Sequence, residues 1–428
     1  MEDNINIPDG WHLKRVVEFA SKMQSGGTPK SDNLEYYNGE IPFVAIDDLS
    51  KSNKYISKTQ KKITNKGLVN SSAWLVPKYS LLYSIYATLG VPRINLIEVA
   101  TNQAILNILP NKKIISLEFL YYLLLEKRNT ILSHSAHTTQ SNLNAKVVKE
   151  LEFVFPKSTV EQNKIAEILS KVDKAIIETE IIISKYNRIK TGLIQDLLTK
   201  GIDEKGNIRN EKTHKFKDSS LGRIPKEWKV DTLKKLCNSD ITYGIVQAGP
   251  NIENGIPYIR TGDMSGDYLS IDNLLRTTPK IAERFERSRV LKGEIVFALR
   301  ATIGKVLLVP EDLNGANLTQ GTARISANEN KVKNEFLLYC LRMQYFKTQI
   351  LENQKGTTFF EISLGHLRNM KVFYPESLDE QNKIIGGLND IENTINKYKE
   401  ELYKLKSIKT GLMQDLLSGK KRVTHLIN

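Results

Sequence analysis

The sequence predicts an α+β fold, in which two mixed α/β domains are separated by an antiparallel two-helix coiled coil and are related by a pseudo-twofold axis from tandem duplication. Three observations predict it. The second half of the 428-residue chain repeats the first at an offset of 214 to 219 residues. The first part of each half contains short apolar runs bounded by turn residues, which is typical of β-strands. The second part carries apolar residues at heptad spacing, which indicates a coiled coil.

The internal repeat is recognised from short motifs that occur twice in the same order. They are Ile-Pro-x-x-Trp at Ile7 and Ile224, Ala-Thr-x-Gly at Ala87 and Ala301, Glu-Phe-Leu at Glu118 and Glu335, Glu-Gln-Asn-Lys-Ile at Glu161 and Glu380, and Gly-Leu-x-Gln-Asp-Leu-Leu at Gly192 and Gly411. A period this long indicates a duplicated domain, because solenoid units are roughly 20 to 50 residues long. Segments 11–155 and 228–374 share only scattered anchors, whereas the segments after them are nearly copied. We infer two domains with different targets on one common frame.

Each globular segment is expected to hold several strands and a helix. In the first segment the predicted strands are Pro42–Ile46, Ser80–Ile85, Ile94–Val99 and Ala104–Leu109. Residues 118–132 predict a helix capped by Ser116, whose hydroxyl can accept a hydrogen bond from an early helical N–H. The alternation of Leu151, Phe153 and Phe155 before Pro156 predicts a half-buried final strand.

The copied segments are predicted to form two long helices. Their shared heptad positions are Ile165, Val172, Thr179, Tyr186 and Leu193 in the first and Ile384, Ile391, Tyr398, Leu405 and Leu412 in the second. Glu161 and Glu380 fall in the first turns, and Gly201 and Gly419 follow the last turns, as helix ends favour. A helix of about 40 residues would be about 60 Å long.

A single amphipathic helix of this length cannot bury its apolar stripe, so we expect the two helices to pair with each other. The alternative is that each packs only on its own globular domain. An antiparallel pair is preferred; a parallel pair stays open, since about 25 extended residues could run back along the helices. Gly192 and Gly411 indicate either a bend or a close backbone approach near the helix ends.

These elements divide the chain into six parts. They are a first globular domain at 1–157, a helical spacer at 158–200, an exposed linker at 201–222, a second globular domain at 223–376, a second helical spacer at 377–419 and a basic tail at 420–428. The linker is expected to be exposed because it carries several glycines and many charges.

The composition favours a nucleic-acid partner. Lys and Arg number 62 against 48 Asp and Glu, which gives a net charge of +14, and no acidic residue lies between Asp48 and Glu98. A field of one sign attracts polyanions, although a solvated basic face without a partner is the alternative. Two cysteines cannot form a disulfide framework, and neither a signal peptide nor a membrane span is recognised, so we expect a cytoplasmic protein without a membrane partner.

Motifs for chemistry are not recognised. The chain lacks a phosphate-binding Gly-x-x-x-x-Gly-Lys-Ser/Thr loop and a Gly-x-Gly-x-x-Gly fingerprint. Cys237 and Cys340 are too far apart in sequence for a zinc finger, and His134 and His137 lack further ligands nearby. We therefore expect no catalytic residue, no metal and no cofactor.

The order of the duplicated motifs resembles the specificity subunits of type I restriction–modification enzymes over essentially the whole chain. That resemblance implies two target-recognition domains at 1–157 and 223–376, each reading one half of a split, asymmetric double-stranded DNA site. It also implies that the helices form an antiparallel spacer that docks two methyltransferase subunits, which restriction subunits join. A stand-alone duplicated DNA-binding protein is the alternative, and an enzyme such as a nuclease is a third interpretation.

The expected DNA contacts lie on basic and polar loops. The candidates are Lys30, Lys51, Lys54, Lys58, Lys61, Lys62, Arg93, Thr138, Thr139, Gln140, Asn142, Arg300, Lys305, Lys355, Thr357 and Thr358. The Lys51 to Lys66 series and the loop from Gly26 to Lys30 suit phosphates. Gln and Asn can bond adenine, and Arg and Lys can bond guanine. The candidate partner-binding residues belong to the copied motifs: Glu161, Gln162, Gln195, Asp196, Glu380, Gln381, Gln414 and Asp415.

Overall fold

A computed structural model describes residues 7–128, 143–353 and 361–427. The chain forms two compact units: unit 1 comprises Met1–Ile181 with Lys399–Asn428, and unit 2 comprises Ile182–Tyr398. The boundaries fall inside two long helices, α7 (Thr159–Thr199) and α13 (Leu378–Leu417). Each unit therefore contains one part of each long helix together with one globular lobe.

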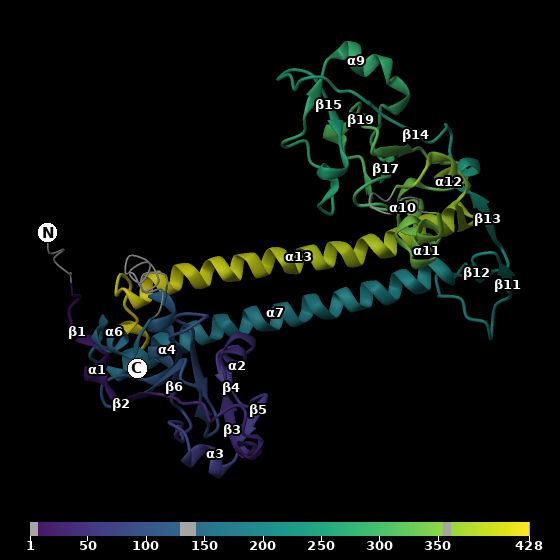
Figure 1. Cartoon of the computed structure of the whole chain (residues 1–428). Helices are drawn as coiled ribbons and strands as arrows, with labels where there is room; N and C mark the ends of the chain where they lie inside the picture. The colour runs from purple at the N-terminus through teal and green to yellow at the C-terminus, as the bar shows by residue number, and fades with distance from the viewer. Residues whose placement is uncertain (1–6, 129–142, 354–360, 428) are drawn as a thin grey trace. The chain divides into compact units, whose positions relative to one another are not determined.

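The lobe of unit 1 contains short strands and short helices. In chain order they are β1 (Trp11–Arg15), α1 (Val16–Phe19), β2 (Ala20–Ser25), η1 (Leu34–Tyr36), β3 (Tyr37–Val44), α2 (Ile46–Lys51), β4 (Tyr55–Ile56), β5 (Lys61–Ile63), α3 (Asn65–Val69), β6 (Leu81–Ser84), β7 (Pro92–Asn95), β8 (Ala100–Thr101), β9 (Ile105–Pro110), α4 (Leu117–Glu126), α6 (Ala145–Glu150) and β10 (Glu152–Pro156). Figure 1 shows these elements gathered beside one end of α7.

Two sheets and a strand pair organise this lobe. The larger sheet has the order β2-β9-β6-β7-β4, the smaller has the order β5-β3-β8, and β1 pairs with β10. All four residues of β6 are buried because its two faces meet different cores. Leu81 and Tyr83 pack with the aromatic side chains of α4, while Leu82 packs with residues near the small sheet. Successive side chains of a strand point to opposite faces of the sheet, so β6 contributes residues to two apolar clusters.

The predicted elements of this lobe are largely confirmed. Strands β6, β9 and β10 match their predicted segments, and the Ser116 hydroxyl accepts a hydrogen bond from Phe119 N at 3.3 Å. The predicted strand at 94–99 was wrong beyond Asn95, because the Asn95 amide donates to the carbonyls of Pro77 and Ile97 and turns the chain. The strand predicted to continue to Ile46 ends at Val44, and α4 ends at Glu126. Residues 129–132 of the predicted helix lie outside the described residues.

Unit 2 contains a second lobe of the same kind. Its elements are β11 (Phe216–Ser219), β12 (Gly222–Pro225), β13 (Trp228–Thr232), α8 (Leu233–Leu236), β14 (Thr242–Tyr243), β15 (Ile256–Ile259), η2 (Thr261–Met264), β16 (Arg276–Thr277), α9 (Pro279–Arg284), η3 (Glu286–Ser288), β17 (Ile295–Ala298), β18 (Val306–Leu308), η4 (Glu311–Leu313), β19 (Asn317–Leu318), β20 (Thr322–Ile325), α10 (Asn334–Arg342), α11 (Gln344–Asn353), α12 (Leu364–Asn369) and β21 (Lys371–Pro375). The 3-10 helix η5 (Thr424–Leu426) follows α13 and belongs to unit 1.

The two lobes share a plan. The pair β13–β21 matches β1–β10, and the parallel pair β15–β19 matches β3–β8. Strand β17 in the sheet β14-β20-β17-β18 is fully buried like β6, with alternate residues in two cores. The tandem duplication read from the sequence is therefore a duplication of topology.

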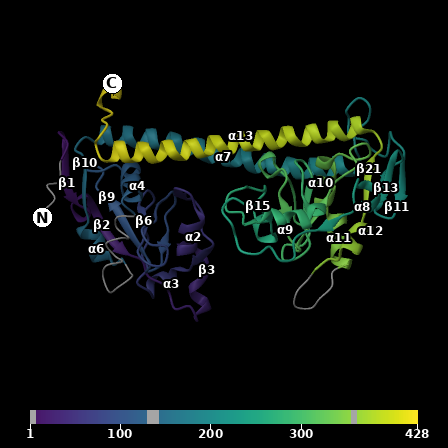
Figure 2. The same cartoon turned by 90° about the horizontal axis from the view of Figure 1, so that it is seen from above.

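The two long helices run antiparallel in both units, as predicted, and Figures 1 and 2 show them side by side. In unit 1, Lys409 pairs with Asp173 at 2.6 Å and Lys406 with Glu180 at 2.8 Å. Residues later in α7 therefore pair with residues earlier in α13, as in an antiparallel pair. In unit 2 the rings of Tyr186 and Tyr398, which share the heptad position, stack with centroids 5.7 Å apart. The parallel alternative is wrong.

Each lobe also buries the ends of both helices. Ile165 and Leu169 at the start of α7 share a core with Leu416 and Leu417 at the end of α13. The matching core of unit 2 contains the end of α7 and the start of α13. The helices are therefore stabilised by each other and by the lobes, and the two arrangements considered from the sequence occur together.

A buried joint repeats at these helix ends. In unit 2 the Glu380 carboxylate accepts hydrogen bonds from Trp228 Nε1 at 3.1 Å and from Arg209 Nη2 at 3.0 Å. Gly201, with φ +62°, packs against it, and a Cβ there would lie 2.6 Å from the Trp228 ring. We call this group, Trp228, Glu380, Arg209 and Gly201, the unit 2 joint.

The unit 1 joint consists of Trp11, Glu161, Arg422 and Gly419. Arg422 donates to the two carboxylate oxygens of Glu161 at 2.6 and 2.8 Å, and its guanidinium carbon lies 5.8 Å from the Trp11 ring centroid. Gly419 has φ +76°, and a Cβ there would lie 3.1 Å from the same ring. Each joint thus ties the first turn of one long helix to the segment that follows the other.

The linker prediction was partly wrong. Residues 201–222 were expected to be exposed, yet Ile202 and Arg209 are 7% and 9% exposed, and β11 pairs with β12 in a hairpin that begins inside this range. The ion pair between Arg209 and Glu380 holds the segment against unit 2. Composition alone does not identify which charged residue of a connection is buried.

We expect Glu380→Gln to lower the free energy of unfolding by about 3 kcal/mol, because it removes the carboxylate that is hydrogen-bonded to the buried Arg209 guanidinium. Urea unfolding followed by circular dichroism measures the loss. The control is Glu376→Gln, which removes an exposed pair with Lys229 and is expected to cost about 0.5 kcal/mol or less. Equal losses in the two variants would contradict a buried structural role for Glu380.

Candidate nucleic-acid interface

The lysine series of unit 1 lies around α2, β4 and β5. Lys51, Lys58, Lys61 and Lys62 are exposed, and so is Lys30 on the loop after β2. Exposed ammonium groups on short strands and turns can reach phosphates of a nucleic acid without rearrangement of the lobe. These five residues remain candidates for phosphate contacts.

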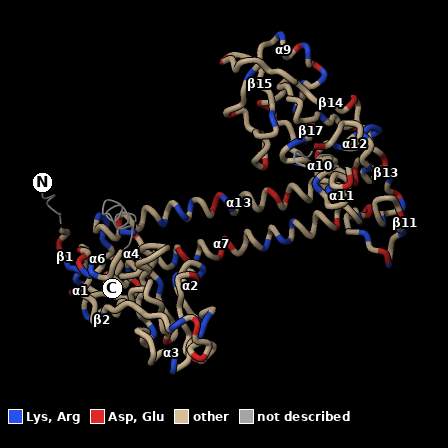
Figure 3. The backbone as a smooth tube through the Cα atoms, viewed as in Figure 1, with Lys and Arg blue, Asp and Glu red and all other residues tan. Residues whose placement is uncertain are grey.

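The stretch between Asp48 and Glu98 contains no acidic residue, but acidic side chains from other segments lie beside its lysines. Asp47 pairs with Lys51 at 3.1 Å, Glu40 with Lys62 at 3.6 Å, and Glu35 with Lys66. Figure 3 shows acidic positions interspersed among basic ones near α2 and α3. Within the described part of the chain, no acidic group lies within 4.0 Å of the ammonium of Lys58 or Lys61. These two therefore present the least compensated charge of the series.

The predicted DNA contact at Lys54 is wrong, because this side chain is buried. Its side chain is 9% exposed, its Nζ donates to Ser170 Oγ of α7 at 2.9 Å, and it pairs with Glu118 of α4. The ammonium also lies 4.3 Å from the Tyr122 ring centroid. Burial lowers the pKa of Lys54, and the Glu118 carboxylate opposes that shift. Lys54 fastens the lobe to α7 and is not available to a phosphate.

Lys54 adjoins a network that sequence reasoning missed. Tyr122 of the lobe donates to Asp173 of α7 at 2.6 Å, and the same carboxylate pairs with Lys409 of α13 at 2.6 Å. Burial, followed by the Asp173 carboxylate, raises the pKa of Tyr122 well above its usual value, so it remains a donor at neutral pH. One lobe residue and both long helices are thereby joined.

Unit 2 contains the counterpart of this network. Tyr339 donates to Glu392 of α13 at 3.3 Å, and Lys190 of α7 pairs with the same carboxylate at 2.9 Å. Tyr339, Glu392 and Lys190 are the repeat equivalents of the three residues in unit 1, with the helix roles exchanged. The duplication offset alone could have revealed this correspondence. Both lobes are fixed to the helix pair by the same chemistry.

The Ala-Thr-x-Gly loops connect β6 to β7 and β17 to β18. Arg300 is exposed and pairs with Glu361 at 2.9 Å, and the half-exposed Lys305 lies 3.9 Å from Asp267. Arg93 is half-buried: its Nη1 donates to the Pro92 carbonyl at 2.8 Å, and burial lowers its pKa. Arg300 and Lys305 are therefore better placed for DNA than Arg93.

Several predicted site residues lie outside the described residues. They are Thr138, Thr139, Gln140 and Asn142 in the first half and Lys355, Thr357 and Thr358 in the second. His134 and His137 fall in the same undescribed segment.

Four of the predicted partner-binding residues are corrected by their burial. Glu161 and Glu380 are 2% and 8% exposed and belong to the joints. Gln162 is fully buried: its amide donates to the carbonyls of Ile114 and Pro156 and its oxygen accepts from Ser116 N.

Gln381 repeats this pattern, with Lys331, Pro375 and Lys333 as its backbone partners. The Glu-Gln motif therefore supports the fold. The sequence predicts an exposed partner-binding surface for this repeated polar pair, because it does not show that the lobe covers the start of each helix.

The other copied motif does present a surface. Gln195 and Gln414 are exposed, Asp196 pairs with Lys200 at 2.7 Å, and Lys421 lowers the pKa of Asp415. Nothing lies within 4 Å of a Cβ placed on Gly192 or Gly411, and both helices continue through them. The close approach considered for these glycines does not occur within the described part of the chain.

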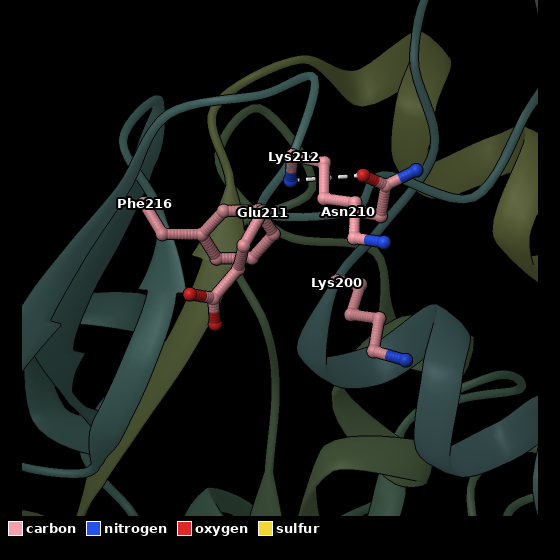
Figure 4. Close-up of a pocket in the computed structure, with 5 residues that line it drawn as sticks. All are labelled: Lys200, Asn210, Glu211, Lys212 and Phe216. Carbon is pink, nitrogen blue, oxygen red and sulfur yellow. Dashed lines mark hydrogen bonds between the residues drawn. The ribbon is translucent and has the colours of Figure 1, made fainter.

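A shallow pocket lies at the end of α7. It has a volume of about 440 Å³ and is lined by Lys200, Asn210, Glu211, Lys212 and Phe216. Figure 4 shows Lys200 at the helix end, three side chains along the connection (Asn210, Glu211 and Lys212) and Phe216 at the start of β11. Lys212 N donates to Asn210 Oδ1 at 2.9 Å, which shapes the turn. The pocket adjoins the exposed copied motif, so the helix end and the connection form one surface of mixed charge.

Among the described residues no group of three or more His, Cys, Asp and Glu is arranged to hold a metal ion. Burial raises the pKa of both thiols, Cys237 and Cys340, to about 12, so neither is a thiolate at neutral pH. Over the same ranges no helix has the length and apolar character to cross a membrane.

Comparison with known proteins extends over both halves. The family model "Type I restriction modification DNA specificity domain" matches residues 8–185 and again 225–406. The specificity subunit of the type I restriction enzyme MjaIX from Methanocaldococcus jannaschii is 27% identical over 437 residues, which cover 98% of this chain and 95% of that protein. The specificity subunit of the EcoBI enzyme from Escherichia coli is 24% identical over 90% of this chain and 81% of its own length.

Solved structures share the fold. The S subunit of a type I restriction–modification system from M. genitalium aligns with a TM-score of 0.56 at 17% identity and covers 97% of this chain and 98% of its own. A chain from a study of complex assembly and conformational transition of the type I system aligns with a TM-score of 0.60 at 16% identity, covering 96% and 98%.

We expect Lys61→Glu to weaken binding to double-stranded DNA and to reduce the steepness of its salt dependence by about one unit, because one phosphate contact is lost. Lys54→Met serves as the matched control. It is expected to lower the free energy of unfolding by about 1 kcal/mol or more, because it removes the hydrogen bond to Ser170 and the ion pair with Glu118. It is expected to leave the salt slope unchanged. Fluorescence anisotropy at several salt concentrations measures both slopes. The same slope change in the two variants would contradict this assignment.

Proposed function

The chain belongs to the type I restriction modification DNA specificity family, and on that premise we propose that it is the DNA-recognition subunit of a type I restriction–modification complex. One observation carries the proposal: the family match occurs twice, on two lobes with the same topology and different sequences. Two different lobes on matching frames can contact two different DNA sequences. The site should therefore consist of two unlike halves separated by an unread spacer.

The distance between the two half-sites follows from the geometry of the duplex and of the helix pair. Two readers that approach the same side of a duplex sit about one helical turn apart, roughly 34 Å. We infer that the antiparallel helices, continuous over 41 and 40 residues, set this distance. The length of the spacer should follow from the length of the helices. The sequence of each half-site should follow from its lobe.

We propose that the chain is a non-catalytic subunit that acts in the cytoplasm with enzyme partners. Two methyltransferase subunits would dock on the exposed copied motif, which contains Gln195 in one half and Gln414 in the other. Restriction subunits would join through the complex, which would then methylate adenine and cleave DNA with ATP. The exposed copy of one motif on both helices favours partners over a stand-alone DNA-binding protein, because an identical outer surface has no role in reading two different half-sites.

Co-purification tests the partners. The chain expressed with its methyltransferase should form a complex of one specificity subunit to two methyltransferase subunits. Gln195→Glu combined with Gln414→Glu should weaken that assembly, because it adds two charges to the docking surface. Mapping of methylated adenines in a host that carries the complex should show a two-part asymmetric motif. A continuous or palindromic motif would refute the proposal.

We expect one inserted heptad after Tyr186 and another after Tyr398 to lengthen the unread spacer by about three base pairs. Seven helical residues add about 10.5 Å, and the duplex rises about 3.4 Å per base pair. Both half-sites should be unchanged in the methylation map. The control inserts the same seven residues between Lys205 and Gly206, an exposed turn outside the helices, and should leave the spacer unchanged. An unaltered spacer in the helix variant would refute control of the spacer by the helices.

A further inference from the structure

The two Ala-Thr-x-Gly turns are the same structure on two different lobes. In unit 1 the turn joins β6 to β7, and Gly90 N donates to the Ser84 carbonyl at 2.9 Å. In unit 2 the turn joins β17 to β18, and Gly304 N donates to the Ala298 carbonyl at 3.1 Å. Each bond closes a loop of the same length, since the offset between the turns is 214 residues throughout.

Both turns also hold an alanine in a strained conformation. Ala87 has φ +59° and Ala301 has φ +57°, in the left-handed region that costs an L-residue with a Cβ about 1 kcal/mol or more. The glycine three residues later is left-handed too, and it packs against a neighbour. A Cβ on Gly90 would lie 3.0 Å from Arg128 Cγ, and one on Gly304 would lie 2.7 Å from Ile350 Cδ1. Strain kept at matching positions indicates a shape that serves function.

The residue before the strained alanine differs between the turns. It is Tyr86 in unit 1 and Arg300 in unit 2, and both are exposed, Tyr86 at 39% and the Arg300 side chain at 46%. A feature shared by both lobes cannot distinguish two unlike half-sites. An exposed residue can distinguish them when its side chain differs between two turns of the same shape.

Basic groups beside the turns complete the arrangement. In unit 2 a cavity of about 510 Å³ borders the turn, and Lys305, Arg342 and Lys347 line it together with Asp267. Arg342 Nη2 donates to the Val306 carbonyl at 3.1 Å, and in unit 1 Arg128 Nε donates to the Leu89 carbonyl at 2.8 Å. An arginine thus supports each turn, and in unit 2 the cationic side chains beside the turn can contact a phosphate backbone.

We propose that Tyr86 and Arg300 are specificity-determining residues, which the matched turns hold against base edges in the two half-sites. This inference rests on the proposed function. The Glu361 carboxylate, 2.9 Å from Arg300 Nε, orients the guanidinium. Arginine bonds both O6 and N7 of guanine, so the half-site of unit 2 contains a guanine read by Arg300. A tyrosine ring suits an apolar contact with the thymine methyl group, so the half-site of unit 1 contains a thymine at the matching place.

The test uses the complex of the full chain with its methyltransferase and a library of duplexes randomised in one half-site at a time. Arg300→Ala should reduce discrimination at one base pair of the unit 2 half-site roughly 10- to 100-fold and leave the other half-site unchanged. Tyr86→Ala should reduce discrimination at one base pair of the unit 1 half-site and leave the unit 2 half-site unchanged. The matched control is Arg223→Ala, an exposed arginine on β12 far in sequence from the turn, which should change neither preference. Thermal melting and subunit stoichiometry verify that the variants fold and assemble.

The outcomes separate the two proposals. If the wild-type complex selects no two-part site, the proposed function fails. If it selects one and Arg300→Ala weakens all sequences equally, Arg300 contacts phosphate and this inference is overturned. Unchanged base preferences in both Arg300→Ala and Tyr86→Ala, with a two-part site retained, overturn it as well.

Discussion

The structure depends on the pairing of two long amphipathic helices whose apolar stripes cannot be buried alone. The heptad positions of α7 and α13 meet in antiparallel order, and the charged residues beside them form ion pairs such as Lys406 with Glu180. Heptad spacing requires a partner helix, and the duplicated chain supplies one from its own second copy. The lobes then close over the helix ends, so that a core of each unit contains residues from both helices.

Buried and half-buried polar groups fix each lobe on its part of the helix pair. The joints around Glu161 and Glu380, the amides of Gln162 and Gln381, and the tyrosine networks that end on Asp173 and Glu392 recur in both units. A buried charge or amide is stable only when its partners are in place, so each of these contacts tolerates few alternative positions of the lobe. Each lobe is thereby held firmly on its own part of the helix pair.

The chain thus separates two tasks by position. Residues that are copied and buried hold the frame, residues that are copied and exposed around Gln195 and Gln414 suit common partners, and exposed residues that differ at equal positions suit the reading of different sequences. Charge is distributed in a less simple way. The lysine-rich stretch of unit 1 is folded against Glu35 and Glu40, so fewer cations face solvent without compensation than the sequence suggests.

The sequence by itself determined the duplication, the helix pair and the main strands, because periodicity and repeated motifs are properties of the order of residues. It also determined the end of β10 at Pro156 and the serine cap of α4. Only the tertiary structure decided that Lys54, Gln162 and Arg209 are buried and that the pair is antiparallel. Burial depends on which distant segments close over a side chain, and a polar residue has the same local pattern whether it meets solvent or a buried partner.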